Sequence, residues 1–241
     1  MRFRRVTTFA RRWQVLECIL AALTIPFFMC DATASSIASW TFETSPPVLS
    51  NSTAFGPLAA DGGSGTASAL HASGLTDWSS PVGNGSLHSW SSTHWAAGDY
   101  YQFQVSTTAL QNIVIDWDQT GSSTSPSAFA LQWSTDGTTF NSVAFYNVLL
   151  TVGPNPAWSS VTAHSQFHFH EDLTSIANLN NQPAIFLRLT AQAAASSVLG
   201  TDRVDNVSIS TVPEPTTFAL ATFGLVGLAV WGWRRKRLHA I

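Results

Sequence analysis

Apolar and polar residues alternate along several short segments between residues 35 and 211. In YYQFQV (100–105), Tyr101, Phe103 and Val105 fall on one side of an extended chain and polar partners on the other. The segments NIVIDWDQT, AFALQWS, SVAFYNVLL, AIFLRLTA and RVDNVSIS continue the series. A period of two is typical of half-buried β-strands, and TGSSTSPS, STDGTT and VGPNPA have the composition of turns. We therefore predict an all-β domain at 35–211, a sandwich or barrel.

The first 34 residues have a different pattern. Five arginines precede an apolar stretch from Val15 to Met29, which leads to the small-residue triplet Ala32-Thr33-Ala34. This order predicts a signal peptide at 1–34, cleaved after Ala34. Glu17 interrupts the apolar stretch, so an uncleaved anchor is the alternative.

Both cysteines of the chain, Cys18 and Cys30, lie within the predicted signal peptide. Cleavage would leave a mature domain without a thiol. That excludes disulfides, cysteine catalysis and Cys-based zinc sites from residues 35–211.

The C-terminal tail contains an uncharged apolar run, Thr216 to Trp233, which is long enough to span a bilayer. Trp231 and Trp233 lie at its end, where a membrane interface would be. Four cations follow at once, and cations beside a span stay cytoplasmic. We predict a single transmembrane helix at 216–233, with the preceding domain facing outward.

The tail as a whole resembles the PEP-CTERM sorting signal of Gram-negative bacteria. Its three parts stand in the same order: the motif Val212-Pro213-Glu214-Pro215, the span 216–233 and the basic cluster Arg234, Arg235, Lys236, Arg237. The resemblance covers 212–237 and implies recognition by an exosortase, a membrane-embedded protease. It also implies an exopolysaccharide-producing, biofilm-forming host. The protein would then be anchored in the cell envelope, or released to the surface or matrix after processing.

The charge of the predicted domain differs from that of the whole chain, which is −3. Between residues 35 and 211 there are two cations, Arg188 and Arg203, against eleven acids, which leaves −9. So acidic a domain has no electrostatic footprint for nucleic acid. It is compatible with sugars or divalent cations as partners.

Two short segments resemble the first and last strands of jelly-roll, carbohydrate-binding-module-like domains: SWTFET near the predicted mature start and GTDRVDNVSIS at the domain's end. The resemblance implies a jelly-roll β-sandwich from about Ser39 to Ser210. In the carbohydrate-binding relatives, an acid after the first aromatic strand and an Asp in the last strand hold a structural calcium. The matching residues here are Glu43 and Asp205. Relatives bind sugars on aromatic platforms, and extracellular polysaccharide is the implied partner.

Two polar clusters and the tryptophans leave alternatives open. The segment HSQFHFHED puts His168 and His170 on one strand face, near His164, Glu171 and Asp172; this pattern suits either a zinc or copper site or a solvated face. Asp116 and Asp118 also share a face, as a polar surface, a cation site or a hydrolytic pair. Four tryptophans lie in Ser- and Gly-rich segments and are either sugar platforms or core: Trp78, Trp90, Trp95 and Trp158.

Three hypotheses for function follow. The leading one is an exported, non-enzymatic surface or matrix protein, sorted by an exosortase and associated with exopolysaccharide or biofilm. The second is a lectin-like carbohydrate-binding module. The third is a secreted hydrolase or metal-dependent enzyme that uses the histidine or aspartate clusters.

Overall fold

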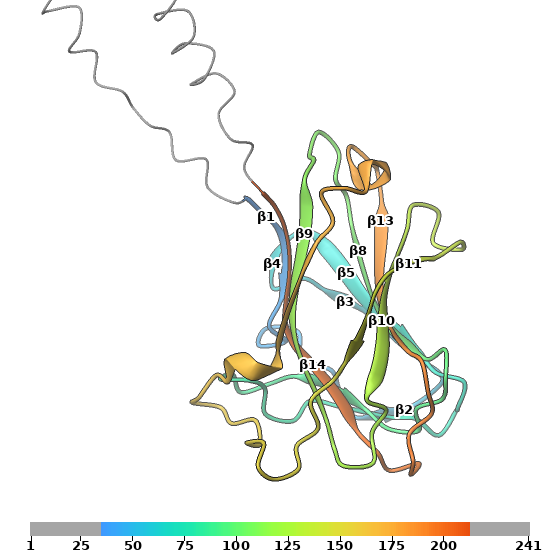
Figure 1. The fold of residues 1–241 in the computed structure, drawn as a ribbon, viewed down its shortest axis with the longest axis vertical. Helices are drawn as coiled ribbons and strands as arrows, with labels where there is room; N and C mark the ends of the chain where they lie inside the picture. The colour runs from blue at the N-terminus through green and yellow to red at the C-terminus, as the bar shows by residue number, and fades with distance from the viewer. Residues whose placement is uncertain (1–34, 213–241) are drawn as a thin grey trace, which may run out of the picture. The chain divides into compact units, whose positions relative to one another are not determined.

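The computed structural model describes residues 35–212, which form two antiparallel β-sheets packed face to face (Figure 1). This confirms the prediction of an all-β, jelly-roll-like sandwich. The strands are β1 Ser35–Trp40, β2 Ser50–Asn51, β3 Ala54–Ala59, β4 Gly62–Gly63, β5 Gly65–Leu70, β6 Asp77–Ser79, β7 Trp90–Ser92, β8 Tyr100–Val105, β9 Ile113–Gly121, β10 Ala128–Ser134, β11 Asn141–Asn147, β12 His168–Asp172, β13 Ile185–Ala191 and β14 Asp202–Thr211.

The eight-stranded sheet has the order β12-β9-β14-β7-β6-β2; in addition, β1 pairs with β14, and β4 pairs with β1. Ser35 of β1 lies opposite Thr211 of β14, so the two ends of the described chain meet at one place, as Figure 1 shows. The six-stranded sheet has the order β11-β10-β13-β8-β5-β3.

The alternating residues of the strands meet between the sheets, as the sequence pattern predicts. Tyr101, Phe103 and Val105 of β8 are buried, and so are Ile115 and Trp117 of β9. Aromatic rings fill much of this core, and their edge-on contacts add to the area that they bury. The ring centroids of Trp95 and Tyr101, for example, lie 5.1 Å apart, with an angle of 69° between the ring planes.

A β-bulge interrupts the last strand. The register of β14 against β9 shifts between Asp205 and Ser208, and Asn206 has a φ of +49°. The inward-facing positions therefore change from Val204 to Val207, and Asp205 faces away from the core, next to Asp118 of β9. Bulges commonly re-aim a side chain in this way.

The turn between β10 and β11 is a hairpin, as Asp136-Gly137 predicts. Asp136 Oδ1 accepts hydrogen bonds from the backbone nitrogens of Thr138 and Thr139, at 2.8 and 2.7 Å. Gly137 has a φ of +73°, a conformation that costs glycine little. The "STDGTTF" segment is thus a turn.

Helix is confined, within residues 35–212, to two 3₁₀ turns, η1 Ser165–Phe167 and η2 Ala177–Leu179. No helix in this part of the chain has the length and hydropathy needed to span a membrane. The predicted signal peptide 1–34, the motif residues Pro213 to Pro215, the span 216–233 and the cluster 234–237 lie outside the described residues.

Candidate functional site

Five polar side chains lie side by side across the outer face of the six-stranded sheet. Strand register places Gln102 between Ser68 and Arg188, and Gln132 between Arg188 and Ser142. Arg188 Nε donates to Gln102 Oε1 at 2.8 Å, and Gln102 Nε2 donates to Ser68 Oγ at 3.3 Å. We call these five residues the Arg188 row. They come from five strands, so the row exists only in the folded sheet.

Two aromatic rings hold the Arg188 guanidinium between them. Its central carbon lies 3.7 Å from the ring centre of Tyr100 and 3.5 Å from that of Phe140. Nη2 also donates to the Tyr100 hydroxyl at 3.0 Å. Partial burial lowers the pKa of Arg188 below its ordinary value. These cation–π contacts fix one of the domain's two cations on this face.

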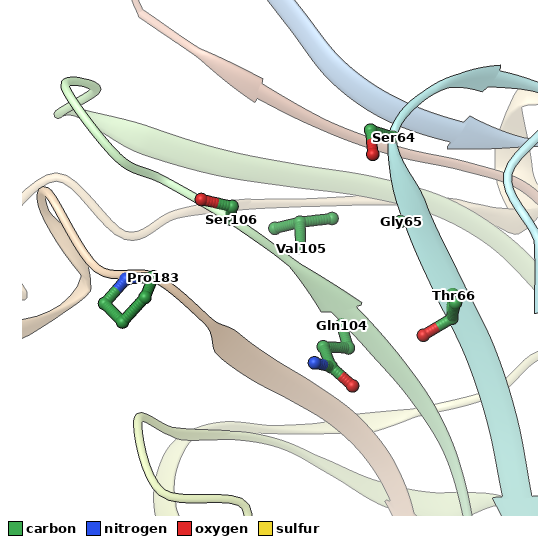
Figure 2. Close-up of a pocket in the computed structure, with 7 residues that line it drawn as sticks. All are labelled: Ser64, Gly65, Thr66, Gln104, Val105, Ser106 and Pro183. Atoms are coloured by element: carbon green, nitrogen blue, oxygen red, sulfur yellow. The ribbon is translucent and has the colours of Figure 1, made fainter.

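A shallow groove of about 260 Å³ lies at the end of β5 and β8 (Figure 2). Thr66 and Gln104, which are opposite each other in the register, line it together with Ser106 and Pro183. Gln104 follows Gln102 on the same side of β8. Amides, hydroxyls, a guanidinium and rings on one face form a donor and acceptor set suited to polyhydroxylated ligands.

The structure decides against tryptophan platforms. Trp78, Trp90, Trp95 and Trp158 are between 0 and 4% exposed, so they belong to the core or pack beneath loops. Trp78 Nε1 donates to the Ser52 carbonyl at 2.9 Å, which lets this ring be buried among polar sequence. The Ser- and Gly-rich surroundings of these tryptophans have the composition of exposed loops, but small residues can also pack closely over large rings and bury them.

The two residues predicted to hold calcium both bind the loop between β6 and β7. Glu43 Oε1 accepts a hydrogen bond from the His88 backbone nitrogen at 2.8 Å. Asp205 Oδ2 accepts from the Asn84 backbone nitrogen at 2.9 Å and from Ser86 Oγ at 2.6 Å. The residues are 162 positions apart in sequence, and one loop links them.

Gly83 allows this loop to approach Asp205. A Cβ at Gly83 would lie 2.0 Å from Ser86 Oγ, 2.1 Å from Asp205 Oδ2 and 2.4 Å from the His88 carbonyl oxygen. Burial raises the pKa of Asp205 to about 7, against hydrogen bonds that lower it. Ser86 Oγ and the His88 carbonyl oxygen thus converge beside the Asp205 carboxylate, a donor set of the hard type that calcium prefers.

A second network runs from Asp205 toward the sheet surface. Asp118 Oδ2 accepts from Asn84 Nδ2 and Asn206 Nδ2, each at 2.9 Å. Asp118 Oδ1 lies 3.0 Å from His168 Nδ1. The β14 bulge and the β6–β7 loop therefore connect the predicted calcium residue Asp205 with the Asp118–His168 pair, which the sequence suggested as separate sites.

His168 and His170 share the outer face of β12, as predicted. His170 Nδ1 lies 2.7 Å from Asp116 Oδ1, and His168 Nε2 lies 3.4 Å from the same oxygen. His164, the suggested third ligand, instead donates its backbone N–H to Asn84 Oδ1 at 2.8 Å. Among residues 35–212, no three His, Cys, Asp or Glu side chains are arranged to hold a metal ion.

The two acids that follow the histidines lie on opposite faces of β12, with Asp172 on the face of His168 and His170. Asp172 Oδ1 accepts from the Thr174 backbone nitrogen at 2.8 Å, and the hydrogen bonds from Thr174 lower the pKa of Asp172. Glu171 lies opposite Ile115 in the register. The face of β9 and β12 is thus a ladder of His–Asp pairs.

One polar group that sequence reasoning missed lies inside the core. His71 Nδ1 is 3.5 Å from Asp99 Oδ2, and His71 Nε2 is 3.5 Å from Ser92 Oγ. All three are at most 3% exposed, and Ser92 Oγ lies 3.0 Å from the Tyr101 hydroxyl. Burial lowers the pKa of His71 to about 3, so the ring is neutral at physiological pH. The order Asp-His-Ser resembles a hydrolase triad, but the serine faces other side chains, and the group serves packing.

Comparisons with known proteins concern the tail and the fold. Residues 211–236 match the PEP-CTERM protein-sorting motif, so the chain ends in a sorting signal that implies export and an exosortase partner. No curated protein sequence matches the chain.

Several solved structures are similar to the chain. A Clostridium thermocellum xylanase 10B chain with CBM22-1 and GH10 modules, complexed with xylohexaose, is 14% identical with a TM-score of 0.41, and the alignment covers 76% of this chain and 30% of that one. The K1 cleaved adhesin domain of Lys-gingipain from Porphyromonas gingivalis W83 is 11% identical with a TM-score of 0.37, covering 69% and 98%. TmCBM61, complexed with β-1,4-galactotriose, is 14% identical with a TM-score of 0.31, covering 72% and 94%. Likenesses at this level of identity and TM-score carry no argument about this chain.

Proposed function

We propose that the protein is a non-enzymatic surface or matrix protein that binds extracellular polysaccharide through the outer face of its six-stranded sheet. An exosortase sorts it through the PEP-CTERM tail and leaves the domain outside the cell. The host forms exopolysaccharide or biofilm, and the domain associates with that material.

The Arg188 row is the observation that supports binding. Three amide or guanidinium side chains, Gln102, Gln132 and Arg188, lie in one line with hydroxyls at both ends. Tyr100 and Phe140 supply flat apolar surface beside them. A sugar is complementary to this surface, because it has hydroxyls around its rim and C–H groups on its faces. The ligand class is therefore a polysaccharide chain that lies across the strands.

We also propose that calcium joins Glu43 and Asp205 through the β6–β7 loop. The Ser86 hydroxyl and the His88 carbonyl would complete the protein's share of oxygen ligands, with water supplying the rest. The support is the convergence of these oxygens over Gly83 and the burial of the Asp205 carboxylate. Such an ion would be structural, because the site lies on the other sheet from the Arg188 row.

The test of binding uses polysaccharide extracted from the host and the full-length protein in detergent. We expect Arg188→Ala and Gln102→Ala each to weaken retention on immobilised polysaccharide by roughly tenfold, the equivalent of about 1.4 kcal/mol. Arg203→Ala is the matched control, because it removes the domain's other cation from the other sheet.

Two results would contradict the proposal. One is equal retention of the Arg188 and Arg203 variants, since a charge effect alone would then explain both. The other is hydrolysis of the polysaccharide by the wild-type protein, which would favour the enzymatic alternative. The melting temperature of each variant separates lost binding from lost folding.

A further inference from the structure

The described residues contain five strands at the edges of the two sheets, and β11 differs from the other four. β2 and β4 have two residues each, and β3 contains Pro57 and a register shift. β12 carries Glu171 and Asp172. Short length, proline and charge all protect an edge from pairing with another chain. β11, NSVAFYN, has seven residues, no charge and no proline.

The side chains of β11 have unequal surroundings. Phe145 is 72% exposed and lies on the outer face, opposite Ala130 of β10. Tyr146 points inward, where its hydroxyl donates to Gln119 Oε1 at 2.8 Å and its ring centre is 4.9 Å from that of Phe169. Contacts within the domain therefore fix the face of the sheet on which each residue of β11 lies.

We propose that β11 pairs antiparallel with β11 of a second copy, with Phe145 on the two-fold axis. Residues opposite each other in an antiparallel pair must face the same side of the sheet. Pairing about Phe145 places Phe145 against Phe145 on the outer face and Ala144 against Tyr146 on the inner one. The bulge at Val143 excludes an axis at Ala144, because it would set Ser142, which faces outward opposite Gln132, against the inward Tyr146.

A second copy is the occupant because the edge is complementary to itself. An exposed ring meets the same ring, and aromatic cross-strand pairs stabilise antiparallel sheets. A two-fold contact of this kind closes without leaving a further edge to extend, as an isologous interface does. The net charge of −9 between residues 35 and 211 opposes the approach of two copies, so added salt should favour pairing.

The regular part of the strand, Ala144 to Asn147, is short, so the pairing is weak and cross-linking is the suitable measurement. We would place one cysteine in the full-length chain and oxidise intact membranes mildly. Cα atoms of directly opposed residues lie about 4.5–5.5 Å apart, within the range of a disulfide. Phe145→Cys removes the ring but keeps the backbone hydrogen bonds that pair the strands, so it should form a disulfide-linked dimer on a non-reducing gel.

Two variants serve as matched controls. Asn147→Cys lies on the same strand, but in this register its two copies would be four residues apart, about 13 Å. Val161→Cys is 88% exposed on a different loop and reports random collision. We expect Phe145→Cys to cross-link about ten times faster than either, since pairing holds the thiols at a high effective concentration. The unsubstituted chain accounts for any product through Cys18 or Cys30.

Equal rates for Phe145→Cys and Val161→Cys would overturn the proposal, and so would no dimer with Phe145→Cys. Faster cross-linking of Asn147→Cys would refute the register. A disulfide adduct whose mass differs from twice the chain would show a different protein at this edge. All measurements are made without added polysaccharide, so the result is independent of the proposed ligand.

Discussion

Replacing Asp205 by Asn should change the way stability depends on pH. Burial raises the pKa of Asp205 to about 7 in the folded protein, against an ordinary value of 3.8. The folded state therefore binds the proton more tightly than the unfolded chain. The stability that this tighter proton binding adds to the free energy of unfolding is fully present below pH 3.8 and is lost as the pH rises through 7. A shift of roughly three units corresponds to about 4 kcal/mol.

The asparagine variant lacks this titration but has a cost of its own. Its amide can accept from Asn84 or Ser86, whereas its NH₂ group would face the Asn206 backbone N–H, which now donates to Asp205 Oδ1 at 2.8 Å. An unmade buried hydrogen bond costs about 1–3 kcal/mol. We expect Asp205→Asn to be the less stable protein near pH 4, and the difference to shrink or reverse by pH 8.

The assay is urea unfolding of the fragment 35–211, followed by tryptophan fluorescence between pH 4 and 8 in the presence of a chelator. In a second series, calcium replaces the chelator. It should stabilise wild type at pH 8 by about 2.7 kcal/mol at a hundredfold excess over its dissociation constant. It should not stabilise Asp205→Asn or Glu43→Ala. A wild-type-minus-variant difference that stays constant from pH 4 to 8 would refute the electrostatic reasoning. An unchanged wild-type curve on adding calcium would refute the site.

Three further results are expected. Burial lowers the pKa of His71 to about 3, so the folded state should lose up to about 5 kcal/mol as the pH falls from 6.5 toward 3, and His71→Gln should flatten that acid limb in urea titrations. Deleting residues 212–241 should release the domain to the medium or periplasm, and replacing Arg234–Arg237 by alanine should disturb its retention; identical fractionation with the full chain would contradict the sorting role. The fragment 35–211 should fold without disulfides and give a β-type circular dichroism spectrum, whereas a dominant helical signal would exclude the fold.

The strands could be predicted from the sequence because their pattern is local. Alternation alone predicts that Tyr101, Phe103 and Val105 are buried on one side of their strand. The pair Asp136-Gly137 predicts the turn that contains it. The Arg188 row could not be predicted, because its neighbours depend on which strands pair and in what register. Gln102 and Gln132 look like ordinary exposed polar residues until β13 places Arg188 between them.

Loop burial was the other limit of sequence reasoning. An exposed polar surface was one of three alternatives for Asp118, yet this residue is 5% exposed beneath Asn84 of the β6–β7 loop and Asn206 of the bulge. The residues next to Asp118 in the sequence do not indicate that Asn84, which is 34 residues away, will cover it. For the same reason, the sequence left open whether the tryptophans were platforms or core, and the structure shows the core alternative. Surface patterns indicate strands well, but they do not indicate which surfaces a distant loop will cover.

The position of β14 has a mechanical consequence. The strand ends at Thr211, where the sorting motif begins, so a pull on the tail that is directed along β14 loads the strand at its C-terminal end. β14 pairs with β9 on one side and with β7 and β1 on the other. Such a load shears many backbone hydrogen bonds at once instead of opening them one after another from an edge. A protein held at a surface by this tail would therefore resist drag from flow or from a moving polymer through the middle of its larger sheet.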